Sequence, residues 1–151
     1  MRKNKKNKKQ RFKLQIAAST DNLQTIRDFI QRLAGEAHFD SEQIDQIALA
    51  VDEACTNAIK HAYQYDASKK IDIEIWLDSD KMEIVVTDYG PGFDPEKLPE
   101  PDINHSMKNA KAGGLGIHLM KKVMDEVRFE IRPRQKNAVH LIKFKKPEKE
   151  Q

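Results

Sequence analysis

The sequence predicts an α/β (α+β) fold: a two-layer sandwich of three helices on one mixed, largely antiparallel sheet. Three segments repeat apolar residues at helical spacing, and five shorter ones alternate apolar and polar residues as strands do. The 151 residues suffice for one domain with a single core. We expect that domain to span 12–146, between a disordered basic tail at 1–11 and a frayed tail at 147–151.

Positive charge is concentrated at the start of the chain. Eight of the 27 basic side chains lie within residues 1–13, where no acidic residue occurs, and the remaining 19 face 24 acidic ones. Such a tail could contact nucleic acid or acidic lipid, but a solvated disordered end is the more common case. We therefore expect no direct binding of nucleic acid.

The single cysteine and the absence of long apolar runs indicate the compartment. Cys55 rules out an intramolecular disulfide, and its place on an apolar helical stripe predicts packing rather than reactivity. No apolar run approaches the roughly 18 residues of a membrane span, and no signal peptide follows the basic start. These features predict a cytoplasmic protein that does not enter the membrane.

The first half of the domain is predicted to be a strand followed by two helices. Residues 12–16 alternate apolar and polar side chains, and apolar residues then recur at helical spacing over 23–37. Asp40 and Gln43 form the pattern of a capping box, which begins a second helix. The apolar stripe of that helix continues over about 41–62.

A β-hairpin is predicted next. Apolar and polar residues alternate over 71–77 and again over 82–87, with a short polar connection between the two segments. Trp76 falls on the polar face of its strand. The pattern leaves open whether this side chain packs at a sheet edge or at a partner surface.

Regular patterns stop between 89 and 112, where glycine and proline recur. A loop of this length in a compact domain is usually functional or disordered. A glycine cluster at 113–116 opens a third helix with apolar positions up to Val127. Two final strands are predicted at 127–131 and 139–144.

Glu53 and Asn57 form the first candidate site. They lie four residues apart on the second helix, so both side chains project from the same face. A carboxylate beside a carboxamide can hold a hydrated divalent cation and orient a nucleophile, although solvated helix positions are the more common explanation of an isolated pair. Asp52 projects about 100° away from Glu53 and is given no catalytic role.

A second candidate site follows the strand at 82–87. Asp88 ends this strand, and Gly90 and Gly92 come after it. A carboxylate at a strand end can accept a hydrogen bond from an exocyclic amine, while glycines let a flat ring approach the backbone. An ordinary turn would explain the same three residues.

The third candidate site is the cluster Gly113, Gly114, Leu115 and Gly116 at the start of the third helix. Backbone N–H groups at a helix N-terminus bind phosphate oxygens. The lysine of a Walker motif does not follow the cluster, which argues against a P-loop nucleotide site.

The order of these three motifs resembles the GHKL ATPase superfamily, which includes histidine kinases and type II topoisomerases. The resemblance covers about 12–145. Residues 53–63, with the sequence Glu-Ala-Cys-Thr-Asn-Ala-Ile-Lys-His-Ala-Tyr, are most similar to the anti-sigma factor serine kinase branch. A histidine-kinase catalytic fragment is disfavoured because the chain lacks a helix pair bearing a phosphoacceptor histidine.

The resemblance implies ATP and Mg²⁺ as cofactors, with Asn57 as the metal ligand and Glu53 as the general base. Asp88 would accept a hydrogen bond from the adenine amine, with Gly90 and Gly92 beside the base. The glycine cluster would donate to phosphates, and 94–112 would form a lid in which Lys108 and Lys111 are possible phosphate partners. Lys60 or His61 could lie near phosphate, but a solvated helix end is expected for both.

The resemblance also implies partners: a sigma factor, an anti-anti-sigma protein of the STAS type, and a second copy of the chain in a homodimer. The predicted function is that of an anti-sigma factor serine kinase. A non-catalytic, nucleotide-gated binding module is the alternative. One departure concerns the last strand, where Asn137-Ala138 stands in place of the usual Gly-Thr pair, whose hydroxyl helps to hold adenine.

Overall fold

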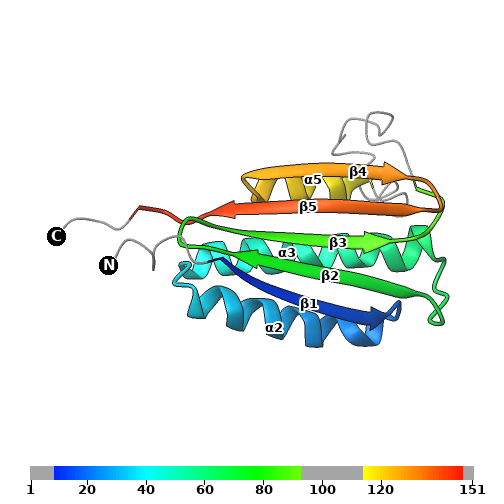
Figure 1. The fold of residues 1–151 in the computed structure, drawn as a ribbon, viewed down its shortest axis with the longest axis horizontal. Helices are drawn as coiled ribbons and strands as arrows, with labels where there is room; N and C mark the ends of the chain where they lie inside the picture. Colours follow the sequence, from blue (N-terminus) through cyan, green and yellow to red (C-terminus); the bar gives the residue numbers. More distant parts are fainter. Residues whose placement is uncertain (1–8, 93–113, 148–151) are drawn as a thin grey trace.

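The sheet has five strands in the order β1-β2-β3-β5-β4, and helices α2, α3 and α5 cover one of its faces (Figure 1). The structure is a computed structural model that describes residues 9–92 and 114–147. Its strands and helices are β1 (Gln10–Ala17), α2 (Leu23–Glu36), α3 (Ser41–Asn57), β2 (Lys70–Leu77), β3 (Lys81–Asp88), α5 (Gly114–Val123), β4 (Glu126–Arg132) and β5 (Lys136–Phe144).

The predicted two-layer sandwich is confirmed. All four strand pairs within the described residues are antiparallel, so this part of the chain contains no parallel pair of the kind a mixed sheet would have. The hairpin of β2 and β3 is present, and its strands pair from Asp72 with Thr87 to Leu77 with Met82.

Four element boundaries differ from the predicted ones by two residues or more. β5 begins at Lys136, three residues before the predicted start at 139, because Lys136, Asn137 and Ala138 continue the pairing with β4. β1 begins at Gln10 because Gln10 and Arg11 pair with the far end of β2, so the strand includes two residues assigned to the tail. The second helix changes character at Ala58–Ala62, which forms the π-helix η2. The third helix ends at Val123, and Val127 belongs only to β4.

The core lies between the helices and the inner face of the sheet. The period of two in β2 buries Ile71, Ile73 and Ile75, while the helical stripes bury residues such as Ile30 and Ile47. Cys55 is fully buried among them, and burial raises the pKa of its thiol to about 12, as expected for a packing residue. None of the described helices has the length and apolar content needed to span a membrane.

Polar side chains fix the ends of two helices. Asp40 and Gln43 form the predicted capping box, in which the Asp40 carboxylate accepts from the Gln43 N–H at 2.8 Å. The buried Lys143 donates from Nζ to the carbonyl oxygen of Val123 at 2.6 Å, at the C-terminus of α5. A cation is stabilised there by the helix dipole.

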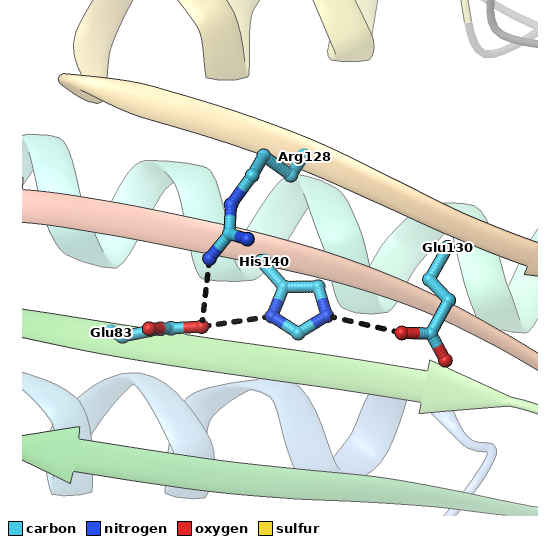
Figure 2. A network of polar contacts seen from close by, with 4 residues as sticks. All are labelled: Glu83, Arg128, Glu130 and His140. Carbon is cyan, nitrogen blue, oxygen red and sulfur yellow. Dashed lines mark hydrogen bonds and ion pairs between the residues drawn. The ribbon is translucent and has the colours of Figure 1, made fainter.

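The face of the sheet turned away from the helices is polar. Figure 2 shows Glu83 contacting His140 Nδ1 at 2.8 Å and Arg128 at 3.5 Å, with Glu130 4.0 Å from the other ring nitrogen of His140. Cross-strand pairs of this kind each contribute about 0.2–1 kcal/mol. Trp76 lies under Arg11, whose guanidinium carbon is 4.8 Å from the ring centroid, so a cation–π contact accounts for its place on this polar face.

Candidate functional site

A cavity of about 150 Å³ lies between the helical layer and the sheet, at the end of β3 where Asp88 stands. An apolar cavity of about this volume can hold a benzene-sized ring. Its walls come from α3 with η2, from α5 and from the last three strands: Ala54, Asn57, Ala58, His61, Ala62, Val86, Asp88, Gly92, Ile117, Met120, Phe129, Ile131, Asn137, Ala138 and Val139.

Helices α3 and α5 approach each other closely beside this cavity. A Cβ atom on Gly116 would lie 2.8 Å from Glu53 Oε2 and 3.5 Å from both polar side-chain atoms of Asn57. Any side chain at position 116 would therefore displace the Glu53 carboxylate. Two of the predicted motifs, far apart in the sequence, meet at this helix contact.

The surroundings of Glu53 favour its protonated form more than water does. Burial is the main cause of the raised pKa of this carboxyl group, and the negative charge of Asp52 adds to it, while Lys60 acts in the opposite direction. A glutamate whose pKa is raised in this way is a better general base near neutral pH than an ordinary surface glutamate.

Asp52 is not among the residues that line the cavity. Its Oδ1 forms an ion pair with Arg27 of α2 at 2.7 Å. The pair joins the first two helices and leaves Glu53 as the acidic residue that faces α5.

Asp88 is held by the turn that follows it. Its Oδ1 accepts hydrogen bonds from the Gly90 N–H at 2.9 Å and from Asn137 Nδ2 at 3.1 Å. Asn137 Nδ2 also donates to the Gly90 carbonyl oxygen at 2.8 Å. Among the described residues, Asp88 Oδ2 has no hydrogen-bond donor, so one carboxylate oxygen stays available for a ligand in the cavity.

Gly92 closes this corner of the cavity. Its φ of +77° favours glycine, and a Cβ there would lie 2.9 Å from Asn137 Oδ1 and 3.0 Å from Ile131 Cγ2. The glycine therefore allows the backbone to cross directly above Asn137 and Ile131.

The structure brings most of the predicted site residues to one place. Asn57, Asp88 and Gly92 line the cavity, Glu53 and Gly116 meet beside it, and Gly90 forms the turn. Gly114 and Leu115 are the first residues of α5. Gly113, Lys108, Lys111 and the predicted lid at 94–112 lie outside the described residues.

Sequence reasoning expected a solvated helix end at His61 and did not place this side chain in the cavity wall. His61 is exposed like Lys60, but it also lines the cavity, and burial followed by the charge of Lys60 lowers its pKa. It lies on η2, where the Tyr63 N–H donates to the Ala58 carbonyl oxygen at 3.0 Å. Single π-turns of this kind are frequent at functional sites. The helical period of the sequence continues through this segment and gives no signal of the change.

The walls define the chemistry that the cavity can support. Apolar side chains from α5 and β4 offer surfaces for a flat ring, and Asp88 offers an acceptor for an amine on that ring. The described residues contain no cluster of three His, Cys, Asp or Glu side chains able to hold a metal ion. The amide oxygen of Asn57 is a hard ligand that fits Mg²⁺ when water and phosphate oxygens complete the coordination.

Comparisons with known proteins agree with this arrangement. The sequence profile of the histidine kinase-like ATPase domain matches residues 16–143. A serine-protein kinase RsbW of Bacillus subtilis is 31% identical over 129 residues, which cover 83% of this chain and 81% of the relative. A serine-protein kinase RsbW of Listeria monocytogenes is 32% identical over 120 residues, 77% of this chain and 76% of the relative.

A solved structure supports the fold. The crystal structure of the RsbU and RsbW domains of a Mycobacterium tuberculosis protein superposes with a TM-score of 0.65 at 17% identity. The match covers 91% of this chain and 33% of that one. The chain belongs to the histidine kinase-like ATPase domain family and, within it, to the branch of the RsbW serine-protein kinases.

Proposed function

We propose that this protein is an ATP-dependent serine kinase that binds a sigma factor and phosphorylates a serine of an anti-anti-sigma protein of the STAS type. The observation that carries the proposal is that Asn57 and Asp88 line the same cavity, with Glu53 beside it at the α3–α5 contact. The RsbW relatives are named as serine-protein kinases, which supports the same reaction.

Asp88 and Asn57 act in binding. Asp88 Oδ2 accepts a hydrogen bond from the adenine amine, and the ring lies against the apolar wall of the cavity. Asn57 would ligate Mg²⁺, which would supply positive charge against the triphosphate when bound. The N–H groups at the start of α5, from Gly114 to Gly116, donate to phosphate oxygens.

Glu53 acts in the transfer. Its carboxylate accepts the proton of the substrate serine hydroxyl as the serine oxygen bonds to the γ-phosphorus. The bond between the γ-phosphorus and the bridging oxygen breaks at the same time, and ADP leaves with that electron pair. The raised pKa of Glu53 suits the carboxylate to this proton transfer.

The test is phosphate transfer from labelled ATP to a STAS protein encoded beside this chain, with wild type compared with Glu53→Ala. General-base catalysis contributes about 10²–10⁴-fold, so we expect transfer to fall at least about 100-fold while ATP still binds. A wild-type protein that binds ATP but transfers no phosphate would overturn the kinase assignment. That result would favour the alternative function, a nucleotide-gated binding module, in which Glu53 is not required.

The thermal stability of a Glu53→Gln variant tests whether the native structure raises the pKa of Glu53. Because the native state raises the pKa of Glu53, the native state holds this proton more tightly than the unfolded chain. The stability that this proton provides is therefore lost as pH rises from the usual glutamate pKa through the raised one. At neutral pH the neutral glutamine should raise the Tm while transfer is lost, and a lowered Tm would contradict the stated environment of Glu53.

The proposed partners are a sigma factor, the STAS protein and a second copy of this chain. Their support is the similarity to the RsbW relatives, which covers about four-fifths of each chain. A pull-down with purified sigma factor, in the presence and absence of ATP, tests the first partner. Sedimentation of the purified protein tests the homodimer.

A further inference from the structure

Asn137 is a buried polar residue in the wall of the cavity that none of the three motifs includes. It is 3% exposed and pairs with Asp88 across the β3–β5 register. Its Nδ2 donates to Asp88 Oδ1 at 3.1 Å and to the Gly90 carbonyl oxygen at 2.8 Å. One amide group thereby joins the base-binding carboxylate to the turn that follows it.

The two acceptors fix the orientation of this amide. A flipped amide would place its oxygen against a carboxylate and a carbonyl, so Oδ1 must point the other way. Within the described part of the chain, Oδ1 is the one buried side-chain polar atom without a hydrogen-bond partner. A buried carbonyl oxygen without a partner is unfavourable, and such departures are expected mainly at functional sites.

The geometry also orients Asp88. Both hydrogen bonds that the carboxylate receives from described residues, from the Gly90 N–H and from Asn137, end on Oδ1. Oδ2 is therefore the oxygen left for a ligand. Oδ2 is an acceptor, so it favours a ligand edge that carries a hydrogen-bond donor.

We propose that Asn137 is a positioning residue that sets base specificity by fixing Asp88 so that Oδ2 meets an exocyclic amine. The inference rests on the proposed function, since it concerns the same nucleotide site. Adenine has an amine at the recognised position, whereas hypoxanthine has a carbonyl oxygen, which the acceptor Oδ2 repels. Without Asn137, the carboxylate can rotate and this discrimination weakens.

The experiment measures the dissociation constants of ATP and inosine triphosphate, both with Mg²⁺, by calorimetric titration. The central pair of variants is Asn137→Val and Asn137→Thr, which have nearly the same shape but differ in a hydroxyl donor. Asn137→Ala is a second variant that lacks the branched side chain. Gln43→Ala is the matched control, because Gln43 is also a buried amide, 4% exposed, but contacts Phe144 at the other end of β5.

Wild type should prefer ATP. A hydrogen bond to a charged group corresponds to about tenfold or more in affinity, so Asn137→Val and Asn137→Ala should lower the ATP preference about tenfold. Asn137→Thr should retain most of the preference, because its hydroxyl can still donate to Asp88. Gln43→Ala should lower the Tm without changing the ratio of the two dissociation constants.

Three results would overturn the inference. If the Val and Ala variants keep the wild-type ratio, Asn137 does not set specificity, although the proposed function stands. If Gln43→Ala changes the ratio equally, general loosening explains the effect and the positioning role is wrong. If wild type binds neither nucleotide, the proposed function fails and the inference fails with it.

Discussion

The two ends of β5 each bury a side-chain amide, but they use it differently. At the Phe144 end, Gln43 donates from Nε2 to the Phe144 carbonyl oxygen at 3.0 Å and accepts from the Asp40 N–H at 3.2 Å. At the other end, Asn137 uses its donors but leaves Oδ1 unpaired. The first end is complete as folded, and the second opens onto the cavity.

We therefore expect the Phe144 end of β5 to contribute mainly to stability and the Asp88 end to contribute mainly to nucleotide binding. A buried amide with both ends bonded stabilises the fold by about 1 kcal/mol per hydrogen bond. Asn137 instead uses its donor group to hold the carboxylate of Asp88, which lines the cavity. Mutations at the two ends should therefore have different consequences: changes at the Phe144 end should affect unfolding, and changes at the Asp88 end should affect nucleotide affinity.

The largest effect is expected for Asp88→Asn. An amide in place of the carboxylate loses a charged acceptor and can present a donor to the adenine amine, so ATP affinity should fall about 100-fold. Titration calorimetry measures the loss, and thermal unfolding of the free protein is the control. An unchanged affinity would place the base elsewhere and remove the contrast between the two ends.

A smaller effect in a different quantity is expected for Gln43→Ala. The substitution removes the donor to Phe144 and half of the capping box, which should lower the free energy of unfolding by about 1–3 kcal/mol. Urea denaturation measures this loss, and ATP affinity should stay within about twofold. A large loss of affinity with little loss of stability would show that the Phe144 end is not merely structural.

The smallest effect is expected for Arg27→Met. The Arg27–Asp52 pair is partly exposed and contributes less than about 1 kcal/mol to stability. Its loss leaves the charge of Asp52 uncompensated beside Glu53, which should raise the pKa of Glu53 further. The acidic limb of the transfer rate should then move to higher pH, because transfer requires the ionised base. If the acidic limb of the pH–rate profile does not move, the charge of Asp52 does not affect the pKa of Glu53.

Most of the fold is predictable from local patterns. The period of two in 71–77 and the helical stripes of α2 and α3 reflect burial on one face, so they gave the layers and the hairpin correctly. The π-helix at Ala58–Ala62 was not predictable, because its residues fit an α-helix equally well. The start of β1 was missed because pairing of Arg11 with Trp76 depends on distant sequence.

The site was predictable only where its residues follow short motifs. Glu53, Asn57 and Asp88 could be identified by their spacing, and their assigned roles stay proposals. Asn137 was noted only as a departure from the family pattern, since its contact with Asp88 joins residues 49 positions apart. The contact depends on the register of β3 against β5, and a single sequence does not specify the register of strands so far apart in the chain.

The most direct test is a crystal structure with Mg²⁺ and a non-hydrolysable ATP analogue. The central claim is that the cavity bounded by Asn57, Asp88 and Asn137 binds the nucleotide. We expect the base to lie against the apolar wall with its amine hydrogen-bonded to Asp88 Oδ2. A base bound outside this cavity, or an empty cavity at saturating analogue, would contradict the account.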